Sequence, residues 1–236
     1  MEKRLKARPE SLTVTYPTRR WTILHQLREK TIQVMKPLEK SHFEPIVHGS
    51  IARGDVSSRS DIDIFITVNI SSFALQNVLE KVNIQPARLY LIQATPNYAM
   101  KAHVEIDDRI TISFPLMKMR KVEREFYKFG GEANLNDLQN DLRVVGVDKR
   151  LMLIEPTKTG HIETTIVGQE ENVAQVLDVS VETVLDRVHT LLRRDAIGRT
   201  GVFIKQELST GQTFEMLLEK LAEKNPAVRR RLMRQC

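Results

Sequence analysis

The spacing of hydrophobic residues divides the first third of the chain into helical and extended segments. Over residues 18–38 apolar residues recur every three or four positions, which predicts an amphipathic helix whose other face is basic. Residues 45–48 are mostly apolar, and residues 61–68 begin by alternating aspartate with isoleucine, so both segments are predicted as strands. A second helix is predicted over residues 71–82.

Short strands dominate the pattern from there to about residue 168. Asp107-Asp108 lies between two strand-like runs and therefore predicts a hairpin turn. Gly130-Gly131 ends a densely charged helical segment. The predicted elements are strands over residues 88–93, 102–106 and 109–114, a helix over residues 116–129, and strands over residues 142–147, 150–155 and 161–167.

The pattern changes to short helices after residues 169–172. Residues 172–188 are typical of a helix-turn-helix, with Asp178-Val179 in the turn and Ser180 as the cap of the second helix. Residues 198–207 and 210–216 then predict a wing hairpin. The whole segment, about residues 170–217, resembles the winged-helix domains of transcription regulators.

Composition narrows the class of protein. The chain has 236 residues, 41% of them hydrophobic and 28% charged, which is typical of a globular protein. A single cysteine, Cys236, excludes an internal disulfide and a thiolate zinc site. No apolar run approaches the roughly 18 residues of a membrane helix. We therefore expect a cytoplasmic protein with no secretory signal and no membrane partner, whose metal, if it uses one, is a hard cation bound by oxygens.

The formal net charge of +6 is unevenly distributed. Basic residues are in excess over residues 1–115 and 190–236, whereas residues 116–189 are mildly acidic. A basic chain favours a polyanionic partner, and this distribution predicts a local patch as its binding surface.

The most informative stretch contains a Gly-Ser pair followed by two aspartates. Gly49-Ser50 follows a predicted strand and offers unhindered backbone and a hydroxyl to phosphate oxygens. Asp61 and Asp63 are two residues apart on a predicted strand, so their side chains point to the same side. Adjacent carboxylates repel each other unless a divalent cation neutralises them, and Mg²⁺ prefers hard oxygen ligands together with substrate phosphates.

These residues together resemble the nucleotidyltransferase superfamily, which includes DNA polymerase β, the CCA-adding enzymes and the small aminoglycoside nucleotidyltransferases. The stretch GSIARGDVSSRSDIDIF is most similar to the archaeal CCA-adding type. Residues 98–105 look like the segment with which that group contacts the triphosphate, and Lys101 stands at its histidine position. The resemblance covers about residues 20–130.

The resemblance implies an α+β fold, in which a nucleotidyltransferase domain with helices packed on a mixed β-sheet is followed by a small winged-helix domain. We expect the domains at residues 1–130 and 169–236, joined by a β-rich segment at 131–168. The implied substrate is an NTP, and the implied cofactor is Mg²⁺ or Mn²⁺ held by Asp61 and Asp63. The implied nucleotide-binding residues are Gly49, Ser50, Arg53 and Lys101.

The chain departs from this family at the third catalytic carboxylate. The strand expected to carry it has Thr111 and Ser113 on its polar side, and a hydroxyl is a weak ligand and a poor base. Glu105 on the neighbouring strand is the candidate substitute, with Asp107 and Asp108 as alternatives. Without a substitute, catalysis is weak or the site binds a nucleotide without transferring it.

Two functions therefore follow from the sequence. The first is transfer of a nucleoside monophosphate from an NTP to an acceptor hydroxyl, with RNA, a protein side chain or a small molecule as the acceptor. The second is a degenerate nucleotide-binding regulator that binds DNA through its C-terminal segment, unless that segment packs on the catalytic domain or forms a dimer. The candidate nucleic-acid-binding residues are Arg187, Arg193, Arg194, Arg199 and Lys205.

Overall fold

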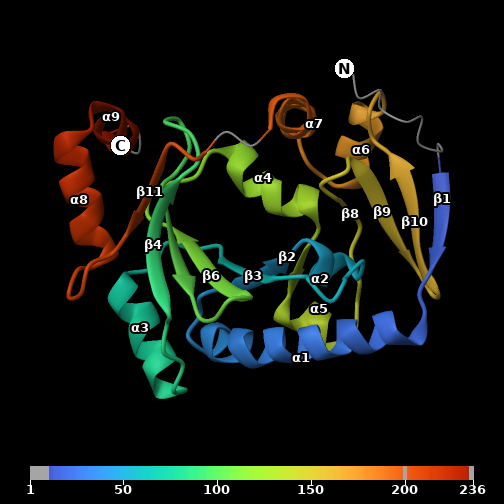
Figure 1. The fold of residues 1–236 in the computed structure, drawn as a ribbon, viewed down its shortest axis with the longest axis horizontal. Helices are drawn as coiled ribbons and strands as arrows, with labels where there is room; N and C mark the ends of the chain where they lie inside the picture. The colour runs from blue at the N-terminus through green and yellow to red at the C-terminus, as the bar shows by residue number, and fades with distance from the viewer. Residues whose placement is uncertain (1–10, 199–200, 234–236) are drawn as a thin grey trace.

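A mixed sheet forms the centre of the computed structural model, which describes residues 11–198 and 201–233 (Figure 1). Seven strands from these residues pair in it, and only β3 and β6 run parallel to each other. The strands lie in the order β11 (Ile204–Glu207), β4 (Arg88–Gln93), β5 (Lys101–Glu105), β6 (Ile110–Pro115), β3 (Ile62–Ile66), β2 (Pro45–His48) and β7 (Glu132–Asn134).

Helices cover both faces of this sheet. α1 (Thr18–Lys40), α3 (Ser72–Lys81) and α8 (Phe214–Lys224) contribute to the larger hydrophobic core, together with inward-facing residues of the strands. The apolar spacing of α1 explains its placement, because Leu24, Met35 and Leu38 are all buried. α4 (Lys121–Gly130) lies over the opposite face, where Tyr127 stacks on Phe65 of β3 with ring centroids 3.9 Å apart.

A second, antiparallel sheet stands beside the first (Figure 1). Its strands are β1 (Ser11–Thr15), β10 (Gly160–Thr165), β9 (Met152–Thr157) and β8 (Gly146–Val147), in that order. α5 (Leu135–Gln139) connects β7 to this sheet. Strand pairing crosses the expected domain limits, because β1 pairs with β10 and β7 pairs with β2.

The predicted helix-turn-helix consists of α6 (Glu170–Val176) and α7 (Val181–Ile197). Its apolar residues form a second core with Phe129 of α4 and Leu153 of β9. Glu125 of α4 accepts hydrogen bonds from the Ser180 amide at 3.0 Å, the Ser180 hydroxyl at 2.5 Å and the Thr183 hydroxyl at 2.6 Å. Burial raises the pKa of Glu125, but these bonds outweigh burial and hold the pKa near 2. The helix pair is therefore docked on α4 and the second sheet.

The predicted wing hairpin is wrong. β11 pairs antiparallel with β4, so the strand extends the central sheet and has no wing partner in residues 208–216. Thr213 instead caps α8, and Phe214 and Leu217 enter the larger core. The sequence of a four-residue strand does not determine which strand it pairs with. β11 pairs with β4, which would otherwise be the unpaired edge strand of the sheet.

Smaller differences concern the ends of elements. The helix expected over residues 116–129 begins at Lys121, because β6 continues to Pro115 and the Glu123 carboxylate accepts a hydrogen bond from the Arg120 amide at 3.0 Å. The Gly-Ser pair is followed by a single helical turn, α2 (Ser50–Arg53), and the described chain ends in α9 (Pro226–Met233). In the part of the chain that the structure describes, no helix is long and apolar enough to cross a membrane.

Candidate active site

Gly49 shapes the turn between β2 and α2. Its φ of 80° lies in the region that disfavours residues with a Cβ atom, and its amide donates to the Gly131 carbonyl at 2.9 Å. Arg28 of α1 supports the turn from below, with hydrogen bonds of 3.1–3.2 Å to the Ile51 and Ala52 carbonyls. The backbone of this turn is therefore fixed on both sides, although the Gly49 amide is not free to bind phosphate.

A hydroxyl contact joins the Gly-Ser turn to the aspartates. Ser50 donates to the Ser60 hydroxyl at 3.2 Å, and Ser60 immediately precedes Asp61. Asp61 and Asp63 are both exposed, and their two-residue spacing at the start of β3 places them on one face of the sheet. The structure thus places Ser50 close to Asp61 and Asp63.

The electrostatics of Asp63 indicate an unneutralised pair of carboxylates. Protein surrounds this side chain on most sides even though it reaches solvent, and this partial desolvation raises its pKa. The negative charge of Asp61 raises it further, and only the charge of Lys149 lowers it. Two such carboxylates fit a divalent cation bound by oxygens. Among the described residues, however, no three His, Cys, Asp or Glu side chains converge on a metal site.

The register of the sheet explains the missing third carboxylate. Asp63 pairs with Thr111 of β6, and Thr111 pairs with Glu105 of β5. Because neighbouring strands lie about 4.8 Å apart, Glu105 is roughly 10 Å from Asp63 across the sheet. Glu105 also forms an ion pair of 2.8 Å with Arg88. The structure therefore does not bring Glu105 to the aspartate pair, and a threonine occupies the adjacent position.

Lys101 lies farther along the same face, under α4. Its ammonium donates to the Tyr127 hydroxyl at 2.9 Å and lies 5.4 Å from the centre of the Phe65 ring. Burial lowers its pKa to about 8. Burial and neighbouring cations, including Lys101, also lower the pKa of His48 to about 3 and that of His103 to about 4. Both histidines are therefore neutral at physiological pH.

Arg53 occupies a different place from the one that the resemblance implies. Its guanidinium is buried and forms a bidentate ion pair with Asp55, with distances of 3.0 and 2.9 Å. It also donates to the Gly130 carbonyl at 2.5 Å. Asp55 and the Gly130 carbonyl occupy the hydrogen-bond donors of the guanidinium. In this structure Arg53 therefore stabilises the turn and does not face Asp61 and Asp63.

Comparison with known proteins identifies the segment that carries these residues. Residues 28–130 match the family model of the nucleotidyltransferase domain. The match supports the nucleotidyltransferase superfamily for this part of the chain, and with it a general nucleotidyl transfer activity. Searches of curated proteins and of solved structures found no match.

The candidate nucleic-acid-binding residues that the structure describes lie on two elements, α7 and β11. Arg187 of α7 turns toward the nucleotidyltransferase domain, where its guanidinium lies 4.9 Å from the centre of the Phe126 ring. Lys205 of β11 lies on the sheet, 4.3 Å from the centre of the Tyr90 ring. Arg193 and Arg194 are exposed on α7, and Arg199 lies outside the described residues.

Sequence reasoning missed Lys149. This residue lies in the turn between β8 and β9, outside the matched segment, yet its charge lowers the pKa of Asp63 and of His48. No local pattern marks one exposed lysine among 36 basic residues. Only the packing of the second sheet beside the Gly-Ser turn brings it there.

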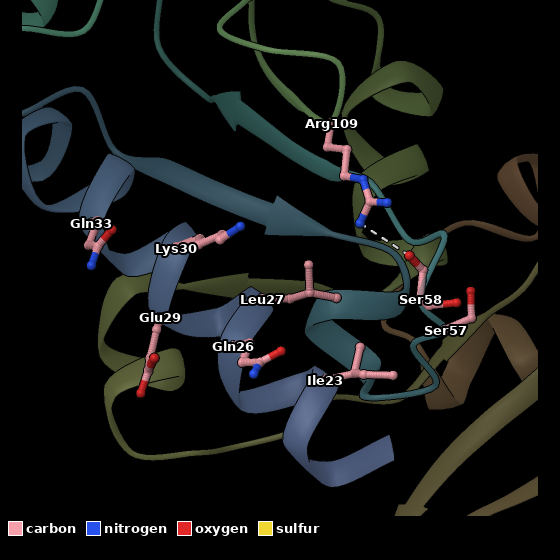
Figure 2. Close-up of a pocket in the computed structure, with 9 residues that line it drawn as sticks. All are labelled: Ile23, Gln26, Leu27, Glu29, Lys30, Gln33, Ser57, Ser58 and Arg109. Carbon is pink, nitrogen blue, oxygen red and sulfur yellow. Dashed lines mark hydrogen bonds between the residues drawn. The ribbon is translucent and has the colours of Figure 1, made fainter. Parts of the chain in front are cut away.

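A separate pocket of about 580 Å³ lies between α1 and residues 57–58 (Figure 2). Arg109 donates to the Ser58 carbonyl at 3.1 Å and closes one side of it. Side chains of α1, among them Gln26, Lys30 and Gln33, line the other side. None of the candidate nucleotide or metal residues lines this pocket, so it lies outside the aspartate site.

Proposed function

We propose that the protein transfers a nucleoside monophosphate from an NTP to an acceptor hydroxyl and releases pyrophosphate, with Mg²⁺ or Mn²⁺ as cofactor. The observation that carries the proposal is the junction between Ser50 and Ser60, which sets the Gly-Ser turn beside Asp61 and Asp63 within the matched domain. The DNA-binding alternative is not proposed, because the wing does not form and Arg187 turns inward.

Each residue of the site has a role in this reaction. Asp61 and Asp63 would hold the divalent cation, which would neutralise charge on the phosphates. Gly49 lets the donor approach the backbone closely, since nothing lies within 4 Å of the space that a Cβ would occupy. The Ser50 hydroxyl turns from Ser60 to a phosphate oxygen, and the Lys101 ammonium adds positive charge on the sheet.

The transfer itself is an in-line displacement at the α-phosphorus. A bond forms between the acceptor oxygen and the α-phosphorus, and the bond to the oxygen bridging the α- and β-phosphates breaks. Pyrophosphate leaves with that electron pair, and the proton of the acceptor passes to solvent, because Thr111 stands where a base would be needed. Positioning of donor and acceptor supplies most of the acceleration.

The experiment that tests the proposal presents the full chain with α-labelled NTPs and separate acceptor pools. The pools are total RNA, a protein extract depleted of nucleic acid, and small metabolites, each with Mg²⁺ or Mn²⁺. We expect metal-dependent label in one pool together with stoichiometric pyrophosphate. Absence of label from all pools, with no pyrophosphate released, contradicts the proposal.

The pKa of Lys101 predicts how NTP binding depends on pH. With a pKa of about 8, the ammonium is charged at pH 7.5 and neutral at pH 9.5. The Lys101 ammonium adds its charge without a direct contact to phosphate, so we expect the affinity for an NTP analogue to fall about threefold over this interval, as for a partly screened charge. Titration calorimetry at the two pH values measures it. Lys101→Met should bind the NTP analogue weakly at both pH values. If its affinity fell between pH 7.5 and 9.5 as much as that of the wild type, the pH dependence would belong to another group.

A further inference from the structure

The turn between β8 and β9 is held rigidly by its own charged residues. The Asp148 carboxylate accepts from the amides of Arg150 at 2.8 Å and of Met152 at 3.1 Å. The Arg150 guanidinium bridges Asp148 and Glu163, with a distance of 2.5 Å to each. Lys149 lies between Asp148 and Arg150, so the backbone that carries it is fixed on both sides.

A buried chain of hydrogen bonds extends this support across the second sheet. Glu163 contacts His161 at 3.0 Å, and the other ring nitrogen of His161 lies 2.5 Å from the Tyr16 hydroxyl. Tyr16 is buried and connects β1 to α1. Burial raises the pKa of Glu163, but hydrogen bonds from Arg150 and His161 outweigh burial and lower it, so the carboxylate stays charged. The turn is thereby anchored to the start of α1.

Close glycine packing sets this turn beside the Gly-Ser pair. A Cβ on Gly146 would lie 2.4 Å from the Gly131 nitrogen, so β8 passes directly against Gly131. The Gly131 carbonyl is the acceptor for the Gly49 amide, and Arg53 donates to the Val147 carbonyl at 3.4 Å. Residues 146–147, directly before Asp148 and Lys149, therefore run past the turn that begins at Gly49.

Lys149 itself is exposed, and within the described residues no carboxylate lies at ion-pair distance from it. Lys149 follows Val147 by two residues, and the Val147 carbonyl accepts from Arg53 of α2, the helical turn that begins at Ser50. An ammonium has three donors and no acceptor, and strongly prefers phosphate or carboxylate oxygens.

We propose that Lys149 binds the β- and γ-phosphates of the NTP, and that the chain of Asp148, Arg150, Glu163, His161 and Tyr16 positions it. The inference rests on the proposed function, because it assigns a ligand to the same site. The second sheet then contributes a phosphate-binding residue to the site, although this residue lies outside the matched segment.

The test is titration of the full chain with a non-hydrolysable α,β-methylene NTP and with the matching nucleoside monophosphate, both in Mg²⁺. We expect Lys149→Met to weaken binding of the triphosphate analogue about tenfold, the effect of one charge-assisted contact. Binding of the monophosphate should change less than about twofold, since the contact is to phosphates it lacks. Lys149→Arg should retain most of the affinity. Lys158→Met, in the next turn of the same sheet, is the matched control.

A double-mutant cycle tests the positioning chain. Glu163→Gln should weaken binding of the triphosphate analogue in the wild-type background but not in Lys149→Met, because the chain acts through Lys149. An equal loss of affinity in both backgrounds would show that Glu163 stabilises the fold without positioning Lys149.

The outcomes separate the two proposals. Tight binding of the triphosphate analogue by both the wild type and Lys149→Met overturns the inference and leaves the proposed function standing. Failure of the wild type to bind any of the four NTP analogues overturns both.

Discussion

Asp61→Asn and Asp63→Asn should each lower the rate of nucleotidyl transfer by at least about 1,000-fold, or roughly 4 kcal/mol of transition-state stabilisation. Each substitution replaces a charged oxygen ligand by a neutral amide at a site where, within residues 11–198 and 201–233, no third carboxylate converges with the pair. Thr111 cannot replace the lost carboxylate, because its side chain is a neutral hydroxyl. Glu105 cannot replace it either, because Glu105 lies two strands from Asp63 and forms an ion pair with Arg88. Single-turnover transfer of α-label measures the loss.

Stability distinguishes this loss of activity from misfolding. The pKa of Asp63 is raised by partial desolvation and by Asp61, which means that the folded protein disfavours its charged form. Asp63→Asn removes that cost, so its thermal midpoint should equal or exceed that of the wild type near pH 7. Asp195→Asn, at an exposed position of α7, is the control and should leave transfer within about twofold, as expected for a surface substitution. Transfer at near wild-type rates by both active-site variants would exclude them as metal ligands.

Arg53→Met should destabilise the fold by about 3 kcal/mol, the usual cost of removing one partner from a buried ion pair. The substitution leaves the Asp55 carboxylate and the Gly130 carbonyl without their guanidinium donor. Asp55 has a side chain that is only 12% exposed, so water replaces the lost contacts poorly. Urea unfolding at neutral pH measures the change.

The control for Arg53 is Arg59→Met, which alters an exposed arginine in the loop that follows α2 and should change stability by less than about 0.5 kcal/mol. The resemblance to CCA-adding enzymes implies another outcome. If Arg53 contacted the nucleotide, Arg53→Met would retain stability and raise the KM for the NTP. That pattern would contradict the structural role.

Local patterns were sufficient to predict most elements of the central domain. The apolar spacing of α1, the alternation at β3 and the paired glycines after α4 each depend on nearby residues, and each prediction agrees with the structure to within a few residues. The aspartate pair was also predictable, because two residues on one strand share a face whatever the strand pairs with.

Features set by distant contacts were not predictable in this way. β11 pairs with β4 across about 110 residues of chain, and no local signal separates such a strand from a wing. The separation of Glu105 from Asp63 depends on β6 lying between their strands. Lys149 reaches the site through glycine packing between β8 and Gly131. The burial of Arg53 had one usable signal, since Asp55 follows it by two residues.

The central claim is that the α-phosphate, rather than the γ-phosphate, is transferred. The most direct measurement compares α-labelled with γ-labelled NTP in parallel single-turnover reactions of the wild-type chain with the accepting pool and Mg²⁺ or Mn²⁺. We expect α-label to enter the acceptor while γ-label leaves as pyrophosphate, and we expect both events to disappear in Asp63→Asn. Entry of γ-label into the acceptor, or release of γ-label as inorganic phosphate without acceptor labelling, would contradict it.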